Sequence, residues 1–190
     1  DKVRTPGDPG LTDLGRCQAD QVARWLTDQG QAVEAVWASP MRRAQETAEP
    51  IAAAARVPVR LEPRLRERMS WEDGSALSFA EFLAEWERAS GDRSYRPTVG
   101  DSSAEAAERF LAAIVDLASA AVPGATVVAV SHGGVTVDAL RTLLGDEAVA
   151  ARRPELVADG VPCGAVTHLR VERSGITVAR LPSTAHLAEG

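Results

Sequence analysis

The sequence predicts an α/β layer fold with a mostly parallel sheet. Segments with the pattern of strands alternate with segments of helical periodicity along the chain. Two apolar strands, Val33 to Ala38 and Thr126 to Val130, each lead directly into a helical segment. With 190 residues, of which 45% are hydrophobic, the chain is long enough for one sizeable core and too short to require two. We therefore predict a single domain over residues 1–190.

The first half of the chain predicts two helix–strand pairs. In order, they are a helix from Thr12 to about Gly30, a strand over Val33 to Ala38, a helix from Pro40 to about Arg56 and a short strand over Val59 to Leu61. Thr12 is a suitable capping residue for its helix. Ser39 can cap the next helix and Pro40 suits a first turn, whereas Pro50 predicts a kink.

The second half continues the alternation. Two Ser-x-x-Glu capping boxes, at Ser78 and Ser102, predict helices running to about Ala89 and Ala121. The remaining predicted elements are a strand over Thr126 to Val130, a helix over Val135 to Leu144, and strands over Ala165 to Glu172 and Ile176 to Leu181. The last two strands predict a hairpin at one edge of the sheet.

The stretch from Arg68 to Gly100 is the least regular part of the sequence. It carries Trp71, Trp86 and Tyr95 among several charged residues. Long irregular connections in compact domains are commonly functional loops. We therefore expect this stretch to lie over the binding pocket as a lid or substrate loop.

Two strand-to-helix junctions predict an anion site. Thr126 to Val130 is followed by Ser131-His132-Gly133-Gly134, which places a histidine at a strand end beside a helix N-terminus. Backbone N–H groups and the helix dipole favour a phosphate at such a place, as does the carboxyl end of a strand in an open sheet. Arg43 lies in the opening turn of the other helix, where its guanidinium can bind phosphate oxygens in bidentate fashion.

Four segments, in this order, resemble the histidine phosphatase superfamily, also called the phosphoglycerate-mutase-like family. Leu11 to Ala19 is similar to its Leu-Thr-x-x-Gly-x-x-Gln-Ala pattern, and Ser39 to Ala48 to its Ser-Pro-Leu-x-Arg-Ala-x-x-Thr-Ala pattern, with Met41 in place of leucine. Leu65-Arg66-Glu67 resembles the segment of the family's acidic residue, and Ser131 to Gly134 resembles its second-histidine motif. The resemblance covers nearly the whole chain.

The resemblance implies a three-layer α/β/α fold with a mostly parallel central sheet, helices on both faces and a phosphoglycerate-mutase-like topology. It also implies phosphomonoester hydrolysis through a phosphohistidine, with Arg43, His132 and Gly133 binding phosphate. His132 and Glu67 would be the catalytic residues within the chain, with Glu67 as proton donor and Glu72 or Asp73 as alternatives. Arg66 and Arg68 flank Glu67 and favour its ionised form, whereas burial against Trp71 would oppose them.

One departure from the family is serious, because its Arg-His-Gly motif, which supplies the nucleophilic histidine on the first strand, occurs nowhere in the sequence. Loss of a central strand would leave two rows of backbone groups unpaired. We therefore expect the strand and its histidine upstream of residue 1. Three alternatives remain: a phosphoglycerate-mutase-type phosphoryl transferase, a phospholigand-binding protein that has lost the nucleophile, and a strand supplied by another chain.

The composition of the chain limits which classes of binding partner are expected. A net charge of −6 and a pI near 5.2 argue against nucleic acid or an acidic membrane surface as a general partner. We expect a phosphorylated small molecule or phosphoprotein as substrate. The sequence leaves open whether the protein forms a homodimer. Cys17, Cys163 and the three histidines show no metal-ligand spacing, so no metal or other cofactor is expected.

Two unpaired cysteines favour the cytoplasm. Cys17 shares a helix face with Leu14 and Val22, which predicts a small core residue. His168 and His186 are predicted to be structural.

Overall fold

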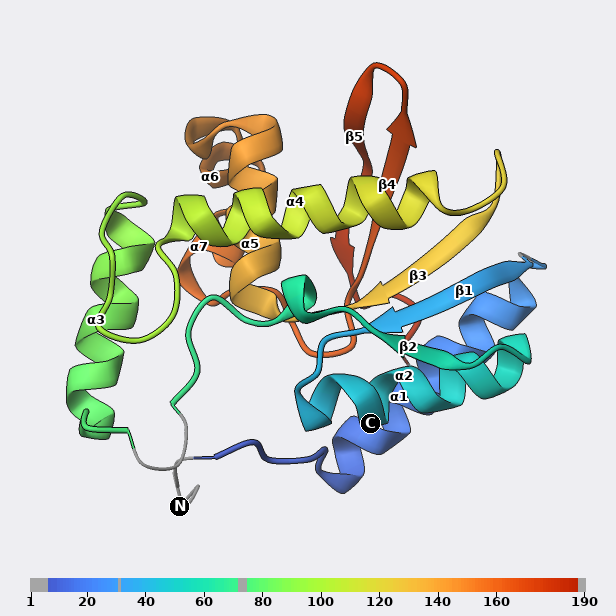
Figure 1. The fold of residues 1–190 in the computed structure, drawn as a ribbon, viewed down its shortest axis with the longest axis horizontal. Helices are drawn as coiled ribbons and strands as arrows, with labels where there is room; N and C mark the ends of the chain where they lie inside the picture. The colour runs from blue at the N-terminus through green and yellow to red at the C-terminus, as the bar shows by residue number, and fades with distance from the viewer. Residues whose placement is uncertain (1–6, 31, 72–74, 188–190) are drawn as a thin grey trace.

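The computed structural model describes residues 7–30, 32–71 and 75–187 (Figure 1). Their elements, in chain order, are α1 (Asp13–Asp28), β1 (Val33–Ala38), α2 (Arg42–Ala55), β2 (Val59–Leu61), a 3-10 turn η1 (Pro63–Leu65), α3 (Phe79–Gly91), α4 (Ser103–Ser119), β3 (Thr126–Val130), α5 (Gly133–Leu144), α6 (Asp146–Arg152), α7 (Pro154–Ala158), β4 (Val166–Glu172) and β5 (Gly175–Ser183).

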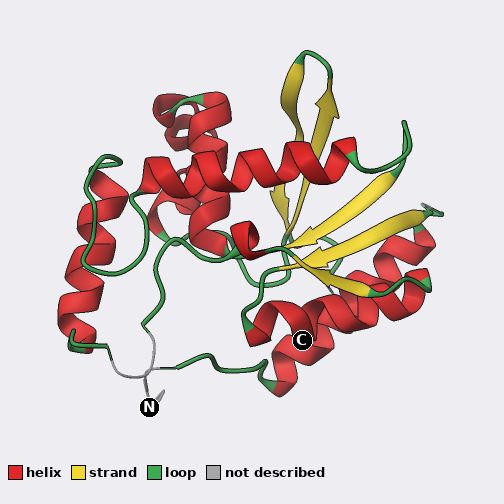
Figure 2. Cartoon of the chain, in the orientation of Figure 1, coloured by secondary structure: helices red, strands yellow, loops and turns green. Residues whose placement is uncertain are grey.

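A parallel three-stranded sheet in the order β2-β1-β3 forms the middle layer. Val36 on β1 pairs with Val59 on β2 and with Val128 on β3. Because the strands are parallel, their carboxyl ends meet at one edge of the sheet, where β1 leads toward α2 and β3 toward α5 (Figure 2). The predicted pair of strand-to-helix junctions is therefore brought together.

Helices cover both faces of this sheet, as predicted. On one face, Val22 of α1 and Ile51 of α2 pack with Val36 and Ala38 of β1. On the other face, Phe110 of α4 and the neighbouring residues of α5 pack against the sheet. Figure 1 shows α4 crossing one side of the sheet while α1 and α2 lie on the other. The structure confirms the three-layer α/β/α class.

The strand β3 has the sequence of an interior strand but lies at an edge. Val128 and Val130 pack into the core on the α1 and α2 side, whereas Val127 and Ala129 pack toward α4 and α5. Strands that are apolar on both faces are typical of the middle of a parallel sheet. Nevertheless, within the described ranges β3 pairs with β1 alone, and all five of its residues are only half-buried. One row of its backbone groups has no strand beside it in this part of the chain.

The predicted C-terminal hairpin forms, but it does not pair with the edge of the parallel sheet within the described residues. β4 and β5 are antiparallel and make a separate two-stranded sheet among the described residues, instead of continuing the edge of the parallel sheet. α4 contacts both β3 and β4, and Val166 of β4 belongs to the same core cluster as Val128 and Val130. The hairpin therefore lies near β3 without pairing to it.

The boundaries of most elements match the predictions closely. The three strands of the parallel sheet have the predicted ends, both capping boxes form, and Thr12 caps α1 by accepting from the N–H of Gly15. The start of α2 differs: its N-cap is Met41, and Ser39 makes a different contact, described below. α5 begins at Gly133, two residues earlier than predicted, and α6 and α7 were not predicted.

The prediction for Cys17 is wrong. Its side chain is exposed, and Leu14 on the same helix is 65% exposed. α1 instead buries Ala19, Val22 and Ala23, which lie on a neighbouring stripe of the helix. In the described part of the chain, no helix combines the length and apolar character needed to cross a membrane.

Candidate functional site

His132 lies at the carboxyl end of β3, in the N-cap position of α5, and is 8% exposed. A hydrogen bond of 2.8 Å joins its Nε2 to the hydroxyl of Ser39, which is fully buried at the end of β1. Burial, together with the positive charges of Arg43 and Arg109, lowers the pKa of His132 to about 3. His132 is therefore a neutral imidazole at physiological pH.

Arg43 is the second residue of α2, so the prediction that it lies in the opening turn is confirmed. One of its guanidinium nitrogens lies 3.7 Å from a carboxylate oxygen of Asp8, and its side chain is one-third exposed. Asp8 also accepts a hydrogen bond of 2.8 Å from the backbone N–H of Arg42. A carboxylate of the protein thus lies at the N-terminus of α2, where the helix dipole favours a negative charge.

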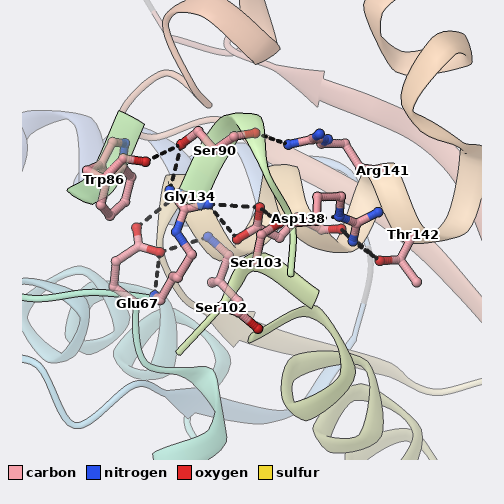
Figure 3. Close-up of polar contacts among 12 residues, drawn as sticks. Glu67, Trp86, Ser90, Ser102, Ser103, Gly134, Asp138, Arg141 and Thr142 are labelled. Carbon is pink, nitrogen blue, oxygen red and sulfur yellow. Dashed lines mark hydrogen bonds and ion pairs between the residues drawn. The ribbon is translucent and has the colours of Figure 1, made fainter. Parts of the chain in front are cut away.

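Glu67 occupies the corresponding place at α5. Its Oε2 accepts from the backbone N–H of Gly134 at 2.9 Å, and its Oε1 accepts from Val135 at 2.7 Å and from Arg68 at 2.8 Å (Figure 3). Burial raises the pKa of Glu67, and these three N–H donors oppose the rise because they favour the ionised carboxylate. The position at the N-terminus of α5 that was predicted to bind an anion is therefore occupied by the carboxylate of Glu67.

Two further groups fix the segment that carries Glu67. Ser131, at the end of β3, donates its hydroxyl to the carbonyl of Leu65 at 2.6 Å. Arg109 of α4 donates to the carbonyls of Arg64 and Arg66 at 2.6 and 3.1 Å and pairs with Asp101. The backbone before Glu67 is thus held from two sides, and Arg109 also brings positive charge toward His132.

The two glycines after His132 are required by close approaches. A Cβ on Gly133 would lie 3.2 Å from the carbonyl oxygen of Val161. A Cβ on Gly134 would lie 2.6 Å from the ring of Trp86 and 2.8 Å from Oε1 of Glu67. Gly134 therefore permits both the Glu67 hydrogen bond and the packing of α3 on α5.

The predicted residues Arg43, His132, Gly133 and Glu67 gather around the N-terminus of α5. The alternative acids Glu72 and Asp73 lie outside the described residues. Ser39, Asp8 and Arg109 were missed as site residues. Ser39 and Arg109 have the sequence pattern of an ordinary helix cap and an ordinary helix-surface arginine, and only the tertiary contacts reveal their positions.

The other two histidines lie away from this site. His168 is exposed on β4, whereas Nε2 of His186 lies 3.0 Å from the carbonyl oxygen of Gly164 and its ring packs against Trp25. Cys17 and Cys163 are both exposed and free. Among residues 7–30, 32–71 and 75–187, no three His, Cys, Asp or Glu side chains are grouped closely enough to hold a metal ion.

The model of the histidine phosphatase superfamily (branch 1) matches residues 1–184. The chain belongs to this superfamily. A probable phosphoglycerate mutase of Erwinia tasmaniensis is 33% identical over 159 residues, which cover 82% of this chain and 73% of the relative. A probable phosphoglycerate mutase of Yersinia pestis is 31% identical over the same shares of the two chains. These comparisons confirm the family that the four motifs indicate.

Solved structures agree with this assignment of the superfamily fold. A mycobacterial glucosyl-3-phosphoglycerate phosphatase is 25% identical with a TM-score of 0.71, covering 97% of this chain and 94% of that one. A phosphoserine phosphatase mutant of Entamoeba histolytica, solved with phosphoserine, has a TM-score of 0.72 at 23% identity, covering 97% and 91%. The second likeness shows the fold alone.

The low pKa of His132 makes a testable contribution to stability. Because the unfolded chain binds a proton near pH 6.5 and the folded chain does not until about pH 3, this contribution is complete above pH 6.5 and is lost as the pH falls. Relative to His132→Gln, the wild type should lose about 1.4 kcal/mol per pH unit well below pH 6.5. Urea unfolding of both proteins between pH 4.5 and 7.5 measures the difference, and a constant difference would contradict a depressed pKa.

The cap formed by Glu67 predicts a second effect on stability. In Glu67→Gln, an amide NH₂ must replace one oxygen and then faces a backbone N–H of Gly134 or Val135, leaving buried donors unpaired. The variant should lose roughly 1–3 kcal/mol of unfolding free energy. Glu81→Gln, in the exposed capping box of α3, is the matched control and should cost less. If both variants lose the same unfolding free energy in urea, the buried cap stabilises the protein no more than an exposed one.

Proposed function

We propose that the protein hydrolyses phosphomonoesters through a phosphohistidine intermediate. The observation that carries this proposal is the neutral, buried His132 at the carboxyl edge of the sheet, close enough to Arg43 for that positive charge to lower the pKa of the imidazole. The guanidinium of Arg43 suits the charged oxygens of a phosphoryl group, and a neutral imidazole can donate a hydrogen bond to one of them. Membership of the superfamily supports the same chemistry.

The nucleophile in this proposal is a histidine on a strand upstream of residue 1. None of the three histidines of the sequence suits the role, since His132 is bound to Ser39, His168 is on the exposed hairpin and His186 is bound to Gly164. The open edge of β3, beside the separate hairpin, supports a further parallel strand in that space. A parallel strand there would end at the same edge of the sheet as His132.

The proposed reaction has two steps. A ring nitrogen of the upstream histidine attacks phosphorus, the ester P–O bond breaks, and the departing alcohol oxygen takes a proton from an acid. Water then attacks the phosphohistidine, the P–N bond breaks, and the deprotonated acid takes a proton from the water as inorganic phosphate leaves. Arg43 and His132 bind the phosphoryl oxygens throughout. We assign the proton to Glu67, because burial raises its pKa and its Oε2 accepts only one N–H, which leaves a site for a proton.

Two other functions each have one observation in their favour. The relatives of about 31–33% identity are named probable phosphoglycerate mutases, which favours phosphoryl transfer between hydroxyl groups of a substrate. The lack of an Arg-His-Gly motif in the 190 residues favours phospholigand binding without turnover. In both cases Arg43 and His132 would keep the same ligand contacts.

His132→Ala tests the hydrolase in the full native protein. Loss of its contact to the phosphoryl group should lower kcat for p-nitrophenyl phosphate by about 100-fold or more. His168→Ala is the matched control, because this histidine is exposed on β4 and should leave turnover unchanged. Unchanged turnover in His132→Ala with a normal unfolding midpoint would refute the proposed role of this histidine.

Mapping the phosphoryl group in the full native protein tests the origin of the nucleophile. When mixed with a phosphomonoester, the full protein should form an acid-labile phosphoprotein. The phosphoryl group should lie on a peptide upstream of residue 1 and on none of His132, His168 and His186. If the full protein binds phosphate but neither hydrolyses esters nor becomes labelled, the binding-only function replaces the hydrolase.

A further inference from the structure

A buried ion pair outside the phosphate-binding residues joins Arg68 to Asp138 of α5. The two side chains are 3% and 1% exposed, and one guanidinium nitrogen lies 3.0 and 3.1 Å from the two carboxylate oxygens (Figure 3). Ser103, the first residue of α4, donates to the same carboxylate at 2.6 Å. The other guanidinium arm of Arg68 donates to the hydroxyl of Ser90 on α3 at 2.8 Å.

Stability alone does not account for this pair. Removing two charges from water costs several kcal/mol per ion, and apolar pairs of similar volume are often as stable. Arg68 is also incompletely satisfied, since its buried Nε has no hydrogen-bond partner among the described residues. The arrangement therefore points to a role in fixing positions, for which the directional hydrogen bonds of a guanidinium are well suited.

The Arg68–Asp138 pair fixes the position of α3. This helix packs mainly on its own small apolar cluster, made by Met69, Phe82 and Ala89, rather than on the main core. Polar contacts fasten its last turn to the body of the protein: besides the Arg68 bond, Arg141 of α5 donates to the carbonyl of Ser90 at 2.8 Å. Figure 1 shows α3 standing at the side of the molecule away from the parallel sheet.

The same guanidinium also fixes the side chain of Trp86. The centre of the Arg68 guanidinium lies 4.2 Å from the centre of the indole ring. The same ring is close to Glu67, since a Cβ built on Gly134 would lie 2.6 Å from the ring and 2.8 Å from Oε1 of Glu67. Arg68 therefore connects a buried carboxylate of α5 to an aromatic side chain that lies beside the proposed proton donor.

We propose that the Arg68–Asp138 pair is a positioning element that seats α3 and holds Trp86 beside Glu67 at the N-terminus of α5. The ester part of a bound phosphomonoester then meets the indole of Trp86, which favours substrates with a flat or apolar group next to the phosphate. The phosphoryl group itself contacts Arg43 and His132 and does not depend on the pair. The statement about substrate rests on the proposed function, whereas the seating of α3 does not.

The test compares the full native protein with the double variant Arg68→Met, Asp138→Leu, which removes both charges and keeps apolar bulk. Asp138→Asn retains the shape but removes one charge, and Arg96→Met removes an exposed cation as the control. Amide hydrogen exchange over residues 79–91 reports on α3. Calorimetric titrations with inorganic phosphate and with phenyl phosphate report separately on the phosphoryl and ester contacts.

We expect α3 of the double variant to exchange about tenfold faster while the unfolding transition stays cooperative. Affinity for phenyl phosphate should fall about tenfold, and affinity for inorganic phosphate should change less than twofold. In Asp138→Asn, the exchange rate of α3 and the affinity for phenyl phosphate should change in the same direction as in the double variant. In Arg96→Met, both should equal those of the wild type. If the double variant does not fold, Asp138→Asn decides by the same measurements.

Unchanged exchange in α3 would overturn the positioning role. Equal losses for phosphate and phenyl phosphate would overturn the link between α3 and the ester part. If the wild type binds neither ligand, the proposed function fails and the statement about substrate falls with it. The exchange measurement then still decides whether the ion pair seats α3.

Discussion

The bonds from Glu67 to the backbone of α5 are the interaction on which the rest of the site depends. They join the segment after β2 to the segment after β3, two parts of the chain that lie 67 residues apart in sequence. A carboxylate at a helix N-terminus is stabilised by the free N–H groups and by the helix dipole. Arg109 and Ser131 hold the preceding backbone so that Glu67 reaches this position. Gly134 is required in turn, because any side chain there would displace Glu67 or Trp86.

This cap changes how the site binds an anion. The N-terminus of α5 meets Glu67 and that of α2 meets Asp8, so N–H donors of both helices already have carboxylate partners. In the proposed function, a phosphoryl group is therefore bound largely by side chains, above all Arg43 and the neutral imidazole of His132. The arginines are held in place by carboxylates and carbonyls before a ligand arrives.

Much of the fold was predictable because short-range patterns determine it. The apolar runs of β1 and β3, the capping boxes at Ser78 and Ser102 and the cap at Thr12 each depend on a few neighbouring residues, and the structure has all of them. The hairpin does not pair with β3 as predicted, because the residues of a strand do not determine its neighbour in a sheet. Cys17 was assigned to the core because it shares a helix face with Val22, but α1 buries Val22 together with Ala19 and leaves Cys17 exposed.

The site was predictable only where a local motif carries it. His132 and Arg43 stand at the predicted strand-to-helix junctions. Ser39, Arg68 and Arg109 take their roles from contacts across tens of residues, which no local pattern encodes. Ser39 illustrates the reason: the sequence indicates its contact with the start of the following helix but not its contact with a histidine from another strand end. In the structure its hydroxyl accepts from the backbone N–H of Met41 at 3.3 Å and also bonds to the buried Nε2 of His132 at 2.8 Å, a contact that only tertiary packing brings about.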